Sequence, residues 1–171
     1  ALLIFDEVQT GFGRTGKWFG KDHFAVMPDI MTLAKAMAGG LPIGAMMASE
    51  SVADALATGD HGSTFAGGPL ICAAALAVIN VIREEELVQR SAENGAYLKS
   101  ELKKLMPRQV RGLGLMVGLD LDADCKSLVE KALARGVLIN STGEHTIRLI
   151  PPLVVEKKEI DQVVSVIGQS L

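Results

Sequence analysis

Short apolar runs separated by glycine and polar turns mark the first half of the chain. Strands are expected over three such runs, residues 2–5, 30–33 and 42–48. The first is uninterrupted, which is typical of a strand buried on both faces. Residues 8–20 form a glycine-bearing loop, and residues 51–57 a short helix capped by Ser49 or Ser51. This alternation predicts an α/β sheet.

Helical periodicity replaces the strand pattern after residue 68. Pro69 suits the first position of a helix, and this helix is apolar almost all round to Ile82, which predicts burial. A second helix follows, ended by Pro107. Its inward positions recur at helical spacing: Leu87, Ser91, Asn94, Leu98, Leu102 and Leu105.

The last third reads as a small α+β unit. A strand pair or bent strand, broken by glycines, is expected over residues 110–121. Two further strands are expected over residues 137–140 and 146–150, and helices over residues 124–135 and 156–171. The boundary lies along the long helix, near residues 88–95. This predicts two domains, residues 1–90 and 91–171.

Composition narrows the classes of function. The chain has 171 residues, 49% of them hydrophobic, and a net charge of −3, which favours a globular protein over one that binds nucleic acid or an anionic membrane. Cys72 and Cys125 read as reduced thiols of a cytoplasmic protein. The chain begins inside a strand pattern without Met, so we expect it to be the C-terminal part of a longer protein.

Two residues carry candidate chemistry. Asp6 ends the first strand, where an open sheet places its ligands. Lys35 is a lone amine among small and apolar neighbours, where desolvation would favour a nucleophilic amine. Together they fit a carbonyl cofactor such as pyridoxal phosphate (PLP). The alternatives are a salt-bridged Asp6, a competing role for Glu7 and a solvated Lys35.

A second motif points to another class. Residues 11–17 fit the phosphate loop of nucleotide hydrolases, but Trp18 replaces the Ser or Thr that holds magnesium. An irregular surface loop, with Arg14 and Trp18 in no catalytic role, is the favoured interpretation. The three histidines show no metal-ligand spacing, so no metal is expected.

Arg148 interrupts an apolar strand. An unpaired arginine there is costly, so it needs a carboxylate. Two partners remain open, a structural acid or the carboxylate of a substrate.

Four blocks in order resemble the class III (subgroup II) PLP-dependent aminotransferases, over essentially the whole chain. They are residues 3–16 (LIFDEVQTGFGRTG), 28–36 with 39–45 (PDIMTLAKA, GGLPIGA), 61–65 (HGSTF) and 147–153 (IRLIPPL). The resemblance implies fold type I, with part of the large-domain mixed sheet followed by the small domain. One departure is residues 66–69, where the family usually has an asparagine before the proline.

The resemblance also assigns roles. Asp6 would pair with the cofactor's ring nitrogen, Val8 would pack on the ring, and Gln9 would bind its phenolic oxygen. Lys35 would hold the cofactor as a Schiff base and act as the proton-transfer base. Ser63 and Thr64 would contact the phosphate from the neighbouring subunit of a homodimer, unless they only cap the following helix. Arg148 would bind the substrate carboxylate.

The blocks most resemble family members that move the terminal amino group of N-acetylornithine to 2-oxoglutarate, in arginine biosynthesis. Other donors stay open: ornithine, 4-aminobutyrate or succinyl-diaminopimelate. A chain that folds but is inactive alone is the remaining alternative, because much of the family's phosphate-binding cup would lie before residue 1.

Overall fold

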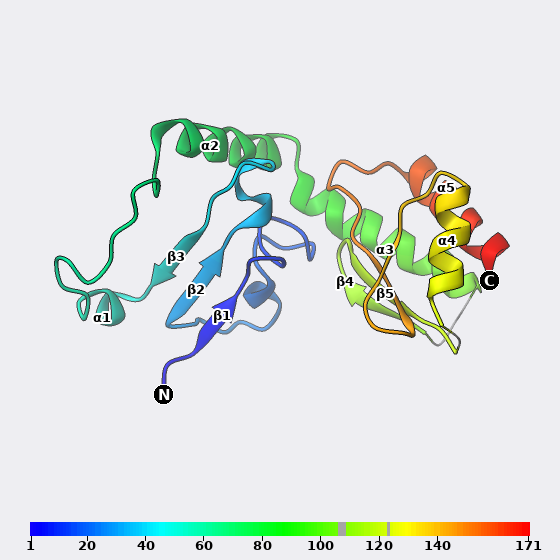
Figure 1. Ribbon diagram of the computed structural model, residues 1–171, viewed down its shortest axis with the longest axis horizontal. Coiled ribbons are helices and arrows are strands. Elements are labelled where there is room, and N and C mark those ends of the chain that lie inside the picture. Colours follow the sequence, from blue (N-terminus) through cyan, green and yellow to red (C-terminus); the bar gives the residue numbers. More distant parts are fainter. Residues whose placement is uncertain (106–108, 123) are drawn as a thin grey trace. The chain divides into compact units, whose positions relative to one another are not determined.

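The chain divides into two compact units in the computed structural model, which describes residues 1–105, 109–122 and 124–171 (Figure 1). The first unit comprises Ala1–Gly13 and Lys17–Leu87. The second comprises Arg14–Gly16 and Val88–Leu171. The short segment Arg14–Gly16 therefore belongs with residues that lie far along the chain.

A three-stranded sheet, in the order β1-β2-β3, organises the first unit. Strand β1 (Ile4–Asp6) pairs in parallel with β2 (Ile30–Leu33), and β2 pairs antiparallel with β3 (Ala45–Ala48). Four helices complete the unit: the 3₁₀ helices η1 (Gly20–His23) and η2 (Lys35–Ala38), and the α-helices α1 (Glu50–Ala53) and α2 (Pro69–Glu84). The three expected strands are confirmed, and Pro69 is the first residue of α2 as predicted. Helix α1 is shorter than expected.

The predicted burial of β1 and α2 is wrong for the described residues. In β1, Ile4 is 59% exposed. In α2, Leu70 is 77% and Leu76 62% exposed, and only Ala75 and Ile82 are buried. A continuous apolar sequence predicts burial only when elements cover both of its faces, and three strands with one long helix leave such faces open.

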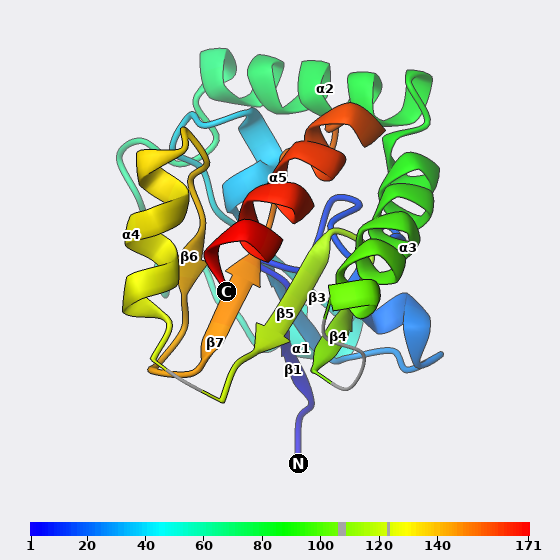
Figure 2. The ribbon, with the colours of Figure 1, turned by 90° about the vertical axis from the view of Figure 1, so that its right-hand side faces the viewer.

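A four-stranded antiparallel sheet, in the order β4-β5-β7-β6, organises the second unit (Figure 2). Its strands are β4 (Val110–Leu113), β5 (Met116–Asp120), β6 (Asn140–Ser141) and β7 (Thr146–Leu149). Its helices are α3 (Leu87–Leu105), which begins at the last residue of the first unit, α4 (Lys126–Ala134) and α5 (Lys157–Ser170). The expected strand over residues 137–140 shrinks to the two residues of β6. Pro107, predicted to end α3, lies outside the described residues.

One face of this sheet and the three helices enclose the core of the second unit. Alternate residues of β5 and β7 face inward, so Val117, Leu119, Ile147 and Leu149 are buried. They pack with Leu98 and Leu102 of α3, Leu128 of α4, and Ile160 and Ile167 of α5. Five of the six inward positions predicted for α3 are buried, whereas Leu105 at its end is exposed.

Side-chain hydrogen bonds link α3 to α5 and to the segment before it. The Asn94 side chain donates a hydrogen bond to the Val155 carbonyl oxygen at 2.8 Å. The Tyr97 hydroxyl of α3 donates to Asp161 of α5 at 2.6 Å, and this hydrogen bond raises the pKa of Tyr97 to about 12. Cys72 and Cys125 are free thiols.

Arg14–Gly16 lies inside the second unit, which corrects the surface-loop interpretation for these residues. The Arg14 carbonyl oxygen accepts hydrogen bonds from the Leu115 amide at 3.0 Å and the Ser91 hydroxyl at 3.2 Å. The Arg14 guanidinium donates to the carbonyl oxygens of Leu115 and Pro151, and its burial lowers the pKa of this group. Arg14 is therefore a structural residue that fastens its segment to backbone carbonyls.

No helix in the described part of the chain is long and apolar enough to cross a membrane.

Candidate active site

The parallel pairing of β1 and β2 brings two candidate residues to one edge of the first sheet. Asp6, the last residue of β1, is opposite Thr32 in the register of the pair. Strand β2 ends at Leu33, and Lys35 follows two residues later as the first residue of η2. The carboxyl ends of parallel strands share an edge, which is where open α/β sheets bind ligands. The register therefore places Asp6 and Lys35 at the same edge.

Asp6 is exposed, and one of its oxygens is fixed. Oδ1 accepts hydrogen bonds from the Val8 amide at 3.0 Å and from the Thr32 hydroxyl at 3.2 Å. Among the described residues, Oδ2 has no hydrogen-bond partner, and Asp6 forms no ion pair. The salt-bridged alternative for Asp6 is thus not realised here. A carboxylate whose one oxygen is held by the protein can accept a hydrogen bond from a protonated ligand nitrogen through its other oxygen.

Lys35 has an unusual backbone. Its φ of +42° lies in the left-handed region, which a residue with a Cβ adopts at a cost on the order of 1 kcal/mol or more. Strain of this kind is often found at functional sites. The side chain is exposed, so the expected desolvation is wrong for the described chain, and it makes no hydrogen bond or ion pair with the described residues. Its amine is available to a ligand.

The two glycines after η2 are explained mainly by the backbone conformation. Gly39 ends η2 with a φ of +62°, and a Cβ there would lie 3.1 Å from Val78 Cγ2 of α2. Gly40 has a φ of +105° with nothing within 4 Å of an added Cβ. Both positions need glycine for the backbone turn.

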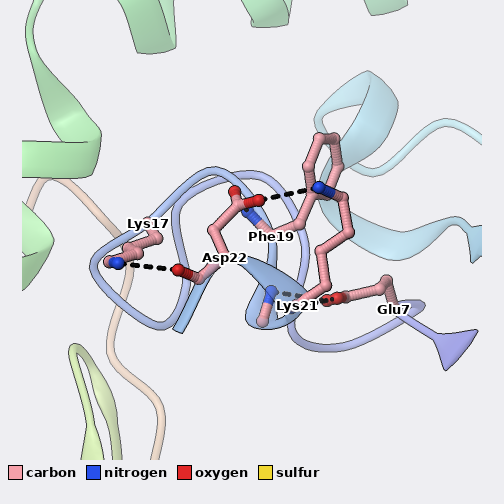
Figure 3. A network of polar contacts seen from close by, with 6 residues as sticks. Glu7, Lys17, Phe19, Lys21 and Asp22 are labelled. Atoms are coloured by element: carbon pink, nitrogen blue, oxygen red, sulfur yellow. Dashed lines mark hydrogen bonds and ion pairs between the residues drawn. The ribbon is translucent and has the colours of Figure 1, made fainter. Parts of the chain in front are cut away.

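Glu7 does not compete with Asp6 for a ligand. Its side chain is 2% exposed and points into the first unit (Figure 3). Oε2 accepts from the Gly20 amide at 2.8 Å and from the Thr10 hydroxyl, and Oε1 accepts from the Lys21 amide at 2.7 Å. Neighbouring strand residues face opposite sides, and here one side is solvent and the other the interior of the unit.

The remaining predicted cofactor residues are less defined. Val8 and Gln9 are half-buried in the turn after Asp6. Ser63 and Thr64 lie in the exposed connection between α1 and α2, and neither makes a hydrogen bond with the described residues. Gly68, not either of them, is the N-cap of α2, so the capping alternative is wrong. The structure brings Asp6, Val8, Gln9 and Lys35 to one edge, without recording a contact of Ser63 or Thr64 to it.

Arg148 lies in β7 of the second unit, on the sheet face opposite the core. Its strand neighbours are Gly118 on one side and Asn140 on the other. Its Nε is buried without a hydrogen-bond partner, and no carboxylate of the described residues pairs with it. The nearby Arg111 instead binds Asp120 through two hydrogen bonds of 2.8 Å. The structural ion-pair alternative for Arg148 is not realised in the described chain, and its cationic fork is open to an external anion.

A pocket of about 500 Å³ in the second unit includes Arg148 in its lining. Its other walls come from the segment before β6, the two prolines after β7 and helix α5, including Val137, Pro151 and Ile160. Most of this lining is apolar. This lining includes core residues on the helix side of the sheet, such as Leu149 and Ile160, so we do not assign the pocket to the Arg148 guanidinium, which lies on the other face.

Two sequence-based readings change with the structure. The sequence analysis did not single out Thr32, which lies opposite Asp6 in the β1–β2 register. Alternation in paired strands is the signal that could have identified it.

The phosphate-loop alternative is not supported, because the segment leads to the 3₁₀ helix η1 rather than to an α-helix, and Lys17 Nζ donates to the Asp22 carbonyl oxygen at 2.7 Å. No cluster of potential metal ligands occurs among the residues described.

Comparison with known proteins identifies the family. Residues 1–171 match the family "Aminotransferase class-III". The acetylornithine aminotransferases of Methanothermobacter thermautotrophicus and Archaeoglobus fulgidus are each 52% identical, over 98% and 96% of this chain. The chain spans 44% of the length of each of these curated relatives.

Solved structures agree. The acetylornithine aminotransferase from Elizabethkingia anophelis has a TM-score of 0.91 at 37% identity, covering 99% of this chain and 47% of that one. An ornithine aminotransferase from Toxoplasma gondii has a TM-score of 0.94 at 37% identity, covering 99% and 43%. Fold type I, inferred from the sequence blocks, is confirmed by these neighbours. The chain belongs to the class III aminotransferase family.

Proposed function

We propose that the full-length protein is a PLP-dependent aminotransferase that moves the terminal amino group of N-acetylornithine to 2-oxoglutarate. One observation carries this: the parallel register of β1 and β2 brings a half-free carboxylate, Asp6, and an unpartnered amine, Lys35, to one sheet edge. These groups suit the protonated ring nitrogen and the aldehyde of PLP. A related structure, from Toxoplasma gondii, is described with PLP at partial occupancy in its active site.

The chain's own residues would divide the work at this edge. Asp6 would accept a hydrogen bond from the ring N–H through Oδ2 and so keep the ring protonated, while the Thr32 hydroxyl and the Val8 amide hold its Oδ1 in place. Val8 would pack on the ring and Gln9 would donate to its phenolic oxygen. Lys35 would hold the cofactor through Nζ and, once released, accept and return a proton at that atom. When bound, PLP supplies an electron sink for the substrate's reacting carbon.

Three further roles complete the proposal. Ser63 and Thr64 would bind the cofactor phosphate across the interface of a homodimer. Arg148 would bind a substrate carboxylate through its open guanidinium. The protein would act in the cytoplasm, in arginine biosynthesis. The name of its relatives, acetylornithine aminotransferase, supports acetylornithine as the amino donor.

Ornithine is the second candidate donor, because ornithine aminotransferases match the fold with TM-scores up to 0.94. The two donors differ in the α-amino group, which is acetylated and neutral in one and charged in the other. Steady-state assays of the full-length protein with 2-oxoglutarate compare them directly. We expect kcat/KM to be at least about tenfold higher for N-acetylornithine, equivalent to about 1.4 kcal/mol. A higher value for ornithine would reverse the assignment, and no transfer from either would reject the activity.

Replacing Arg148 tests the carboxylate role. Arg148→Met keeps an apolar stem but removes the charged fork, so we expect kcat/KM to fall by about 10²-fold or more in the full-length protein, mainly through KM. Arg148→Lys should restore part of the loss, because a point charge cannot form the paired hydrogen bonds. Arg111→Met is the matched control, since Arg111 is exposed and already bound to Asp120. If Arg111→Met lowered kcat/KM as much as Arg148→Met, the carboxylate-binding role of Arg148 would be contradicted.

A further inference from the structure

Glu7 is the only charged residue that is buried in the part of the chain the structure describes, with 2% of its surface exposed. Burial of a carboxylate is unfavourable unless hydrogen bonds replace those of water. The amine of Lys21 binds Asp22 at 2.8 Å, so it does not neutralise Glu7 (Figure 3). The Glu7 carboxylate must be held by dipoles alone.

Three donors from two loop segments converge on this carboxylate. The amides of Gly20 and Lys21, at the start of η1, each donate to a different oxygen, at 2.8 and 2.7 Å. The Thr10 hydroxyl donates to Oε2. A Cβ at Gly20 would lie 3.1 Å from that oxygen, so the backbone approaches the carboxylate closely. Glu7 thereby fastens the turn after β1 to η1.

The backbone of Glu7 fastens the same turn to the sheet. Its amide donates to the Thr32 carbonyl oxygen at 3.0 Å, which continues the β1–β2 pairing past Asp6. Its carbonyl oxygen accepts from the Gly11 amide at 3.0 Å, and a Cβ at Gly11 would lie only 2.9 Å from that oxygen. The residues on either side of Glu7 are Asp6 and Val8. The placement of Asp6 and Val8 therefore depends on Glu7, which lies between them and whose side chain points into the first unit.

We propose that Glu7 is a positioning residue: its buried carboxylate fixes the turn that sets the direction of Asp6, Val8 and Gln9 toward the cofactor. The inference rests on the proposed function. Glu7 acts through its neighbours and does not touch the cofactor, because both of its oxygens are occupied by protein donors. Since the Val8 amide binds Asp6 Oδ1, a shift of the turn moves the Asp6 carboxylate as well.

Glu7→Gln in the full-length protein tests this, because glutamine keeps the shape but sets an NH₂ group against one of two amide donors. Asp124→Asn is the matched control: Asp124 also accepts from a backbone amide, that of Lys126 at 2.8 Å, but in the second unit and without contacting Glu7 or its donors. The readouts are PLP affinity from the visible absorption band, the pH midpoint of that band, and hydrogen exchange of residues 6–11. We expect Glu7→Gln to weaken PLP binding by about tenfold and to shift the midpoint. Asp124→Asn should change affinity less than about twofold.

The outcomes separate the two proposals. Unchanged affinity and midpoint in Glu7→Gln, with normal binding by the wild type, would overturn the positioning role alone. A wild-type protein that binds no PLP would overturn the proposed function and the role of Glu7 with it. If Glu7→Gln does not fold, Thr10→Val removes one donor and should change affinity and exchange in the same direction by a smaller factor. Wild-type values for Thr10→Val in that case would also overturn the positioning role.

Discussion

Replacing Lys35 with alanine in the full-length protein is expected to lower amino transfer by about 10³-fold or more and to abolish covalent retention of PLP. The loss should be chemical rather than structural. The Lys35 side chain is exposed and has no partner among the described residues, so its removal creates no cavity and leaves no group unpaired. Alanine also has a Cβ, and therefore keeps the same backbone strain at a φ of +42°.

Borohydride reduction followed by peptide mass analysis measures the covalent link, and thermal unfolding checks the fold. Lys17→Ala is the control, because Lys17 lies in the same unit but binds the Asp22 carbonyl oxygen in the phosphate-loop-like segment. It should retain both activity and the reducible link. A cofactor still trapped on a lysine in Lys35→Ala would show that another amine holds it. ATP binding that is lost in Lys17→Ala would revive the nucleotide-binding alternative.

Local sequence rules were sufficient for the two strands that precede Asp6 and Lys35. Short apolar runs fixed β1 and β2, and the acid and the lysine follow directly after those runs in the sequence. The parallel pairing of β1 and β2, which the structure shows and the sequence pattern alone does not specify, then brings the two residues to one edge. Arg148 could be singled out in the same way, because a charge in an apolar strand is a local anomaly.

Exposure could not be predicted from the same patterns. The apolar residues of α2 and β1 indicate that these elements suit burial, but the degree of burial depends on what packs against them. In the described residues their faces are open, as Leu70 and Ile4 show. Lys35 is exposed among the described residues for the same reason. Apolar neighbours in sequence are not neighbours in space, so they do not by themselves exclude water.

Contacts between distant parts of the chain were also missed. Arg14 binds Ser91, Leu115 and Pro151, which lie 77, 101 and 137 residues away. Nothing in the glycine-rich pattern of residues 8–20 distinguishes such a segment from a surface loop. The useful signal is elsewhere: Gly95 stands in the middle of a good helical pattern, where glycine is unfavourable, and such a glycine often marks close packing.

Replacing Gly95 with alanine is accordingly expected to destabilise the second unit, by about 3 kcal/mol or more, although alanine favours an isolated helix by about 1 kcal/mol. An added Cβ on α3 would lie 2.0 Å from the Gly114 carbonyl oxygen. Gly114 cannot move away from the added Cβ, because the backbone of Thr15 lies close on its other side. A Cβ built on Gly114 would lie 2.3 Å from the Thr15 carbonyl carbon. Three backbone segments thus lie in contact with no side chains between them.

Urea unfolding of the full-length protein, with hydrogen exchange of the α3 amides as the local probe, measures this effect. Gly168→Ala is the matched helical control. Its Cβ would meet only the end of the Leu105 side chain, 3.2 Å away, and Leu105 is 40% exposed and free to move. We expect Gly168→Ala to change stability by less than about 1 kcal/mol, because helix propensity and a small displacement of Leu105 nearly cancel. If Gly95→Ala were as mild as this control, the close packing of α3, Gly114 and Thr15 would not exist in solution.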